Sequence, residues 1–157
     1  MKPRCFRLTM DSNVEDAVVA STMIRGLLEQ LRVARRDTDM VELCLTEALV
    51  NAVRHAYEGK SGSEVSLEIE MKPGAIALEV ITAGIGTTKA ALEAVAAKAA
   101  RFDASALDDL PEGGRGMLII SAGMDEWDYF QRGNTNVLRM RKSLHSAAPD
   151  AQDAANG

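Results

Sequence analysis

The sequence predicts an α/β fold, a two-layer sandwich in which a mixed, mostly antiparallel β-sheet carries its helices on one face. Two pairs of segments with alternating apolar residues predict hairpins, over residues 65–80 and 127–140. Two longer segments, residues 14–31 and 39–59, have apolar residues at helical spacing. The predicted order is a strand, two helices, a hairpin, a helical insert, a short helix and a last hairpin, which favours helices packed on one side of the sheet.

The chain is expected to open with a strand that leads into an amphipathic helix. Phe6, Leu8 and Met10 alternate with polar residues, as in a half-buried strand. Ser12 and Glu15 match the Ser-x-x-Glu capping box, in which each side chain satisfies a free amide of the first turn. The buried face of this helix is expected to carry Val14, Val18, Ser21, Ile24, Leu28 and Leu31.

The second helix is predicted to begin near Asp39, whose carboxylate can cap its first turn, and to end at Gly59. Apolar residues occupy most of its circumference, so we expect it to be deeply packed. The hairpin that follows should turn at Pro73-Gly74, and the last hairpin at Arg132-Gly133-Asn134.

An insert separates the two hairpins. Residues 87–101 are alanine-rich and should be helical, and residues 102–112 should be irregular. Gly113-Gly114-Arg115-Gly116 should then open a short apolar helix over residues 117–124.

Composition and charge narrow the class of protein. Hydrophobic residues make up 46% of the chain and charged residues 26%, which is ordinary for a soluble globular domain. A net charge of -5 argues against sequence-independent binding of nucleic acid, because such binding requires clustered cations. Cys5 and Cys44 are too few for a disulfide framework or a zinc site.

The chain is expected to be one domain followed by a tail. It has no internal repeat, no signal peptide, and no apolar stretch of the roughly 18 residues that a membrane-spanning helix needs. We therefore expect a cytoplasmic protein without a membrane partner. Residues 1–144 should form the domain, and residues 145–157, rich in Ala, Asp and Asn, should be disordered.

A polar strip runs along the second helix. Glu47, Asn51 and His55 are spaced four residues apart, so their side chains should lie about 5–6 Å from one another on one face. A carboxylate in a mostly buried helix is costly unless it is paired. Asn51 can offer a neutral oxygen to Mg²⁺, and Glu47 can hold a hydroxyl that attacks a phosphate. The alternative is a solvated strip in which Glu47 pairs with a nearby arginine and His55 is structural.

Two glycine clusters support a phosphate site. Gly84 and Gly86 directly follow a predicted strand, while Gly114 and Gly116 precede a predicted helix, whose free amides can bind an anion. The third glycine of a dinucleotide fingerprint is absent, because Lys89 occupies its position. No Gly-x-x-x-x-Gly-Lys-Ser/Thr loop is present, which excludes a P-loop enzyme.

This combination, in this order, resembles the Bergerat ATP-binding fold of the GHKL superfamily, and within it the bacterial anti-sigma-factor serine kinases. Residues 45–57, from Leu45-Thr46-Glu47 to His55-Ala56-Tyr57, are similar to the N box of these kinases. Gly114-Arg115-Gly116-Met117 is similar to their second glycine box, and Gly133-Asn134-Thr135 to their last hairpin turn. The likeness spans about residues 4–144.

The resemblance implies a role for each matching residue. Glu47 would be the general base that accepts a serine proton, and Asn51 would bind Mg²⁺. The ATP-binding residues would be Asn51, Thr82, Gly84, Gly86, Gly114, Arg115, Gly116, Met117 and Thr135, with residues 83–115 as a flexible lid. The implied partners are a sigma factor and a small anti-anti-sigma protein that is phosphorylated on serine. A homodimer built through the first strand and helix is also implied.

One position departs from the family pattern. The family has an aspartate that accepts a hydrogen bond from the adenine amino group, where this chain has Thr82. A hydroxyl can still accept, but it carries no charge. Two hypotheses remain open: an ATP-dependent serine kinase that also sequesters a sigma factor, and a catalytically degenerate partner-switch module of the same fold with weak or no turnover.

Overall fold

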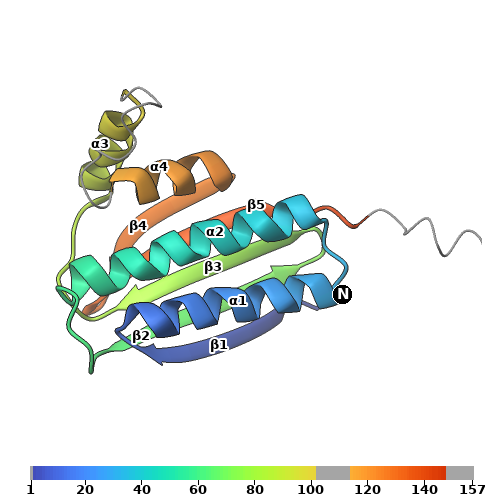
Figure 1. Cartoon of the computed structure of the whole chain (residues 1–157), viewed down its shortest axis with the longest axis horizontal. Coiled ribbons are helices and arrows are strands. Elements are labelled where there is room, and N and C mark those ends of the chain that lie inside the picture. The colour runs from blue at the N-terminus through green and yellow to red at the C-terminus, as the bar shows by residue number, and fades with distance from the viewer. Residues whose placement is uncertain (1, 102–113, 148–157) are drawn as a thin grey trace, which may run out of the picture.

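The computed structural model describes residues 2–101 and 114–147 and confirms the predicted two-layer α/β fold (Figure 1). The strands are β1 (Arg4–Asp11), β2 (Glu64–Lys72), β3 (Ala75–Thr82), β4 (Glu126–Arg132) and β5 (Thr135–Ser143). They form one sheet in the order β1-β2-β3-β5-β4, in which every neighbouring pair is antiparallel.

The helices cover one face of this sheet. They are α1 (Val14–Gln30), α2 (Arg35–Asn51), α3 (Lys89–Ala99) and α4 (Gly114–Gly123), and a π-helical turn, η1 (Ala52–Ala56), extends α2. The α2 helix packs between α1 and α4, and α4 packs in turn against α3. None of the helices in the described ranges combines the length and the apolarity that a bilayer crossing requires.

The two predicted hairpins, β2–β3 and β4–β5, pair with each other through β3 and β5. In the β2–β3 hairpin, alternate residues face the helices and are buried, and Leu67 lies opposite Val80 in the register. Gly74 has φ +70° at the turn, a conformation that glycine adopts without a steric penalty. Gly133, with φ +62°, has the same role between β4 and β5. The buried residues of β2, β3 and β5 form one core with α1, α2 and α4.

The predicted capping box at α1 is wrong. Asn13 is the N-cap, and its side chain accepts a hydrogen bond from the amide of Asp16 at 2.7 Å. Ser12 instead donates to the carbonyl of Lys60 at 2.7 Å and accepts from the amide of Ser63 at 3.1 Å. Ser12 therefore joins the end of β1 to the loop before β2, a long-range contact that a local capping motif does not reveal.

The buried face of α1 also differs in part from the prediction. Ser21, Ile24 and Leu28 are buried as expected, but Val14 and Val18 are exposed. The helix instead turns two alanines, Ala17 and Ala20, toward the interior. This rotation leaves large apolar side chains on the surface of the domain.

The α2 helix begins at Arg35, four residues before the predicted start, and no side chain caps it. Asp39 is therefore inside the helix, where it pairs with Arg25 of α1 at 2.7 Å instead of capping a turn. The regular helix ends at Asn51 and continues as the π-turn η1 to Ala56, short of the predicted end at Gly59.

The insert follows the prediction in part. The α3 helix lies within the predicted residues 87–101. Gly114 and Gly116 belong to the first turn of α4 instead of preceding it, so the start predicted at residue 117 is late by three residues. The irregular segment predicted over residues 102–112 and Gly113 lie outside the described residues.

Residues 145–147 are attached to the domain, although the predicted tail begins at residue 145. The amide of His145 donates to Asp37 at 2.7 Å, and the amide of Ala147 donates to the carbonyl of Arg32 at 2.7 Å. These bonds join the chain after β5 to the connection between α1 and α2. The rest of the predicted tail, residues 148–157, lies outside the described residues.

Candidate functional site

A cavity of about 310 Å³ lies where the C-terminal end of α2 meets the ends of β3 and β5 and the helices α3 and α4. Its walls are mostly apolar, with polar groups from Asn51, His55, Thr82, Tyr129 and Asn136. A largely apolar cavity of about 300–1,000 Å³ with a few polar groups is typical of small-molecule sites.

Glu47 and Asn51 lie together at the first turn of α4. A Cβ placed on Gly116 would be 2.6 Å from the amide nitrogen of Asn51 and 2.8 Å from a carboxylate oxygen of Glu47. Both side-chain ends therefore converge on the same point, and a larger residue at position 116 would force them to move. Both residues are half-buried, and Asn51 also lines the cavity. The i, i+4 spacing on α2 thus brings together the two residues on which the predicted chemistry depends.

Gly84 lies against the π-turn. An added Cβ at this position would be 2.0 Å from the carbonyl oxygen of Ala56, and the amide of Ile85 donates to that same oxygen at 2.8 Å. The hydrogen bond satisfies a carbonyl at the end of η1 and fixes the segment after β3 beside α2. Tyr57 supports the same segment, because its hydroxyl accepts from the amide of Ala83 at 3.0 Å. Gly84 is therefore required by close backbone packing.

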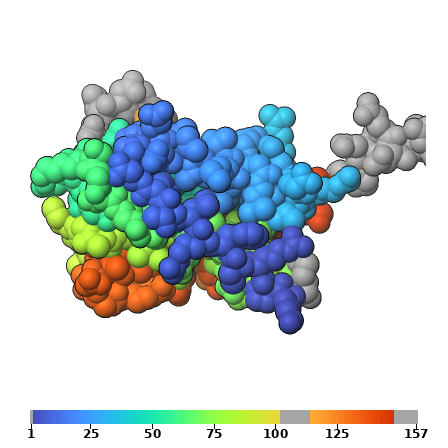
Figure 2. Space-filling model, turned by 90° about the horizontal axis from the view of Figure 1, so that it is seen from below, coloured from blue at the N-terminus to red at the C-terminus, as the bar shows by residue number. Residues whose placement is uncertain are grey.

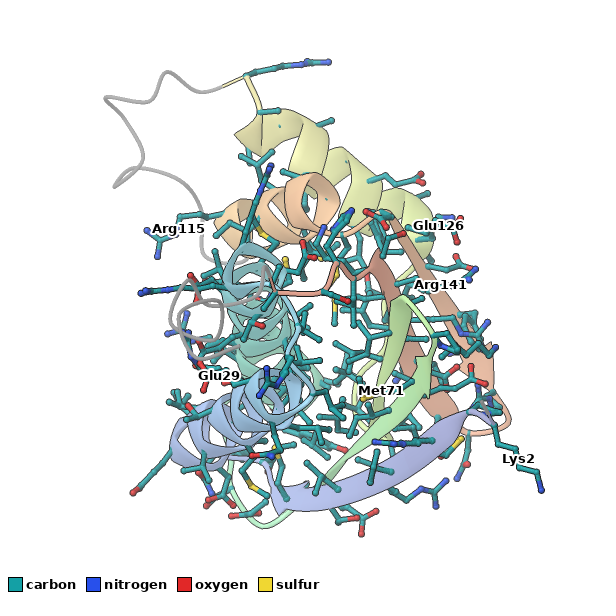
Figure 3. The ribbon with its side chains drawn as sticks, turned by 90° about the vertical axis from the view of Figure 1, so that its right-hand side faces the viewer. Lys2, Glu29, Met71, Arg115, Glu126 and Arg141 are labelled. Atoms are coloured by element: carbon teal, nitrogen blue, oxygen red, sulfur yellow. The ribbon has the colours of Figure 1, made fainter. Side chains whose placement is uncertain are left out.

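The other residues implied by the resemblance are distributed around this site. Met117 is buried and lines the cavity. Gly114 packs against α3, 3.7 Å from Ala99 when a Cβ is added. Arg115 is exposed and extends away from the first turn of α4 (Figure 3). Thr135 is outside the cavity lining, because its hydroxyl donates to the carbonyl of Arg132 within the hairpin turn at 2.7 Å.

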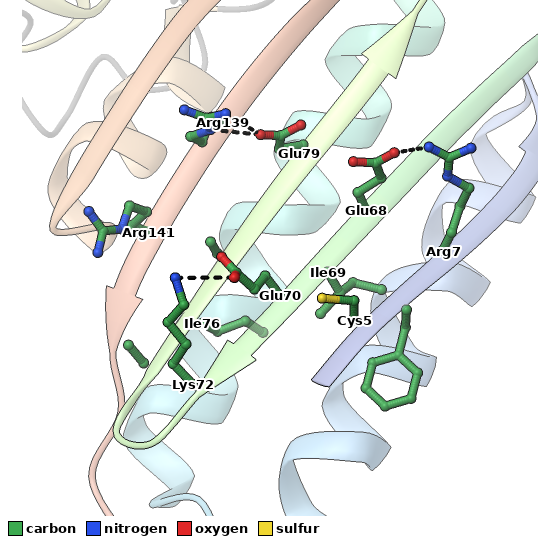
Figure 4. A pocket seen from close by; sticks show the side chains of 13 residues that line it. Cys5, Arg7, Glu68, Ile69, Glu70, Lys72, Ile76, Glu79, Arg139 and Arg141 are labelled. Atoms are coloured by element: carbon green, nitrogen blue, oxygen red, sulfur yellow. Dashed lines mark hydrogen bonds and ion pairs between the residues drawn. The ribbon is translucent and has the colours of Figure 1, made fainter. Parts of the chain in front are cut away.

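A second hollow, of about 720 Å³, lies on the opposite face of the sheet, which the helices leave open (Figure 4). Its charged side chains are paired: Arg7 with Glu68, Lys72 with Glu70 at 3.1 Å, and Arg139 with Glu79 at 2.7 Å. It contains none of the residues predicted to carry chemistry. We therefore place the candidate site in the smaller cavity, beside Glu47 and Asn51.

The α2 helix is buried in an apolar environment at Cys44, one turn before Glu47. Burial raises the pKa of the Cys44 thiol, on the adjoining turn of α2, to about 11, and the charge of Glu47 acts in the same direction against that of Lys142. Cys44 is therefore a neutral thiol at physiological pH.

The described residues contain no group of three or more His, Cys, Asp or Glu side chains that could hold a metal ion by themselves. The amide oxygen of Asn51 fits the hard oxygen ligands that Mg²⁺ prefers, and this ion commonly takes one or two protein oxygens together with phosphates and water. Asn51 can therefore contribute to a Mg²⁺ site only when a phosphate ligand supplies further oxygens.

Sequence reasoning missed Asn136, which lines the cavity and is buried. A signal was present, since Asn136, Leu138 and Met140 occupy alternate positions of one strand and share its inward face. A polar residue on that apolar face requires an explanation. Tyr129 was also missed; its hydroxyl accepts from the amide of Thr87 at 3.1 Å and supports the wall near α3.

Comparisons with known proteins identify the family of this chain. Residues 10–142 match the family model of the histidine kinase-like ATPase domain. The serine-protein kinase RsbW of Bacillus pumilus (strain SAFR-032) is 26% identical over 127 residues, which are 81% of this chain and 78% of that protein.

Two solved structures share the fold at lower identity. The RsbU and RsbW domains of Rv1364c from Mycobacterium tuberculosis align with a TM-score of 0.63 at 15% identity over 92% of this chain, which spans only 34% of that longer chain. The SiaB–SiaC complex from Pseudomonas aeruginosa gives a TM-score of 0.50 at 14% identity, covering 90% of this chain and 89% of the other. The family match extends over most of the chain, from β1 to β5, and the chain therefore belongs to the histidine kinase-like ATPase domain family.

Proposed function

We propose that this protein binds ATP with Mg²⁺ in the cavity beside α2 and phosphorylates a serine on a small anti-anti-sigma protein, and that it otherwise sequesters a sigma factor. The observation that carries this proposal is the convergence of Glu47 and Asn51 on Gly116, next to a largely apolar cavity. The family match and the similarity to a serine-protein kinase support it.

The residues present fit this chemistry. ATP, when bound, supplies the phosphoryl group, and Mg²⁺ supplies charge to the phosphate oxygens. Asn51 would hold the metal through its amide oxygen, and the first turn of α4 would offer its free amides to the phosphates. Glu47 would accept the proton of the serine hydroxyl as the new oxygen–phosphorus bond forms and the bond to the leaving diphosphate breaks.

A second function is favoured by Thr82. Its side chain is neutral where the family resemblance implies an aspartate, and a hydrogen bond to a charged group contributes roughly 1.5–3 kcal/mol. Weaker adenine binding is consistent with a partner-switch module that keeps the fold and the partner surface without turnover. Retention of Glu47 and Asn51 side by side supports the kinase over this module.

The α1 surface supports an association with protein. Val14, Val18, Val19 and Met23 lie on α1 with exposed fractions between 43% and 55%. The same face of the molecule includes β1, which is an edge strand of the sheet as far as the chain is described (Figure 2). Exposed apolar patches of this kind mark interaction sites. We assign this α1 patch, consisting of these four residues, to a homodimer interface.

Nucleotide binding is tested first, by the thermal shift of the whole chain with ATP and Mg²⁺. We expect millimolar ATP to raise the melting temperature of the wild-type protein and Asn51→Ala to abolish the shift, because a ligand that binds only the folded state stabilises it. Glu70→Gln, on the open face of the sheet, is the control and should keep the shift. No shift for the wild type would contradict ATP binding.

Phosphoryl transfer is tested next, with labelled ATP and a candidate anti-anti-sigma protein. Glu47→Gln keeps the size of the side chain but cannot accept a proton, so we expect transfer to fall by about 10²–10⁴-fold while ATP still binds. Transfer that persists in Glu47→Gln would remove the assigned base. ATP binding without transfer to any candidate partner would favour the binding module.

A further inference from the structure

Two polar side chains lie side by side in the strand wall of the cavity. Thr82 of β3 and Asn136 of β5 are direct partners in the antiparallel register, and their exposed fractions are 6% and 5%. Directly opposed residues project from the same face of a sheet. Their neighbours along β3 and β5 on that face, Val80 and Leu138, also line the cavity, so Thr82 and Asn136 are the polar residues that these two strands turn into it.

The orientation of the Asn136 amide is set by its surroundings. Its nitrogen, Nδ2, donates to the carbonyl oxygen of Gly84 at 3.0 Å, and that oxygen can only accept. The amide oxygen, Oδ1, therefore points the other way, toward Gly86, where an added Cβ would be only 2.5 Å away. Gly86 lines the cavity as well.

The Oδ1 oxygen of Asn136 has unused hydrogen-bonding capacity. Its described partner is the side-chain nitrogen of Gln131, at a distance of 3.4 Å, which is long for a hydrogen bond. An amide oxygen accepts two hydrogen bonds. A buried acceptor with capacity to spare, at the edge of a cavity, is complementary to a ligand that donates.

We propose that Asn136 is the residue that selects the base of the bound nucleotide, with Oδ1 accepting a hydrogen bond from the exocyclic amino group of adenine. This assignment rests on the proposed ATP binding and makes its base specificity explicit. The acceptor for the adenine amino group would then lie on β5. The neighbouring strand β3 has Thr82 at the paired position and therefore offers no carboxylate there.

The same geometry disfavours a 6-oxo purine. In hypoxanthine or guanine the group at this position is a carbonyl, which would face Oδ1 as a second acceptor. The amide cannot reverse without breaking its bond to Gly84 and leaving that buried carbonyl without its partner. The Thr82 hydroxyl can rotate to donate or to accept, so it does not discriminate between the two kinds of base.

The test compares ATP with inosine triphosphate, which has the same ribose and triphosphate but a 6-oxo base. Dissociation constants for both are measured by calorimetry, with Mg²⁺, on the wild-type chain, Asn136→Ala, Asn136→Ser and Thr82→Val. We expect the wild type and Thr82→Val to prefer ATP by about tenfold or more, the size of one hydrogen bond. In both Asn136 variants the ratio of the two dissociation constants should fall close to one. Alanine has no hydrogen-bonding group, and a serine hydroxyl can rotate to accept from one base or donate to the other.

The ratio of the dissociation constants for ATP and inosine triphosphate distinguishes a residue that recognises the base from one that only supports the fold. If Asn136 only holds Gly84 in place, its variants will weaken both nucleotides equally and keep the preference for ATP, which would overturn the assignment and leave ATP binding intact. Loss of the preference in Thr82→Val instead would also overturn it. If the wild type binds neither nucleotide, the proposed function fails together with the assignment. Asn136→Ser keeps a small polar group and guards against a variant that does not fold.

Discussion

Gly116 of α4 lies directly over Asn51 of α2, and a methyl group added to it would come within 2.6 Å of the Asn51 amide nitrogen as that side chain is placed. The first turn of α4 therefore approaches the C-terminal half of α2 closely at a position that has no side chain. A substitution here acts on the candidate site and on the packing of two helices together.

Gly116→Ala should destabilise the protein and weaken nucleotide binding. The added methyl group would come within 2.8 Å of both Asn51 and Glu47, and overpacking of this kind costs about 1–3 kcal/mol. Urea unfolding measures the loss of stability, and thermal shift with ATP measures the loss of binding. Gly26→Ala is the matched control: nothing lies within 4 Å of its Cβ position on α1, so it should stabilise the helix by about 0.5–1 kcal/mol. Equal stability of the two variants would contradict the close contact at Gly116.

Asp37→Asn should lower stability at neutral pH and have little effect in strong acid. Burial alone would raise the pKa of the Asp37 carboxyl, but hydrogen bonds from the amide and ring of His145 outweigh burial and hold it below its ordinary value of 3.8. A depressed pKa means that the ionised form is stabilised in the folded state, so the contribution is complete above about pH 4 and is lost as the pH falls through the folded pKa.

The measurement is the free energy of unfolding in urea from pH 7 to pH 2. We expect a difference of about 1–2 kcal/mol between wild type and Asp37→Asn at pH 7, which shrinks in the acid range. Asp39→Asn is the control, because Asp39 is half exposed and its surface pair should contribute less than about 1 kcal/mol. A difference that is constant across this pH range would contradict the role of the ionised carboxylate.

The two cysteines should differ sharply in reactivity. Cys5 is exposed on β1, whereas Cys44 is fully buried and burial raises its pKa to about 11. At pH 8 a thiol reagent should modify one cysteine rapidly, and Cys5→Ser should remove this phase. The slow phase that remains measures the opening of the α2–α4 contact, where Gly123 packs against Cys44. Two equally fast thiols would show that this contact is open in solution.

The α1 patch should control the oligomeric state. Val19→Glu combined with Met23→Glu places two charges on its exposed apolar face and should convert a dimer into a monomer, as measured by light scattering after gel filtration. Ser121→Glu adds a charge at an exposed position of α4 and should leave the mass unchanged. A double variant with the mass of the wild type would place the interface elsewhere or show a monomeric protein.

Local periodicity was sufficient to predict the strands of the two hairpins and the position of Glu47 beside Asn51. Alternation with a period of two fixes which residues of β2 and β3 are buried, and a helix places residues four apart on one face whatever surrounds it. The errors arose where distant segments compete for a side chain. Ser12 matches a capping motif but bonds to residues 60 and 63, and the rotation of α1 depends on how closely its alanines approach the sheet.

The site shows the same limit. The family resemblance implied a nucleotide-binding role for Thr135, but in the alternation of β5 it is Asn136 that lines the cavity. Which residue faces Thr82 depends on the register between β3 and β5, and these strands are more than 50 residues apart in the chain. The burial of an amide among apolar residues was visible in the pattern of β5, but its partner Gly84 was not.

The bonds that attach His145 and Ala147 to the connection before α2 also place residue 147 beside the N-terminal end of that helix. The cavity lies at the C-terminal end of α2, about 25 Å away along a helix of 17 residues. A fluorophore or an affinity handle coupled at the exposed residue 147 would thus be attached far from the cavity. Binding of nucleotides and proteins can then be followed on the immobilised molecule.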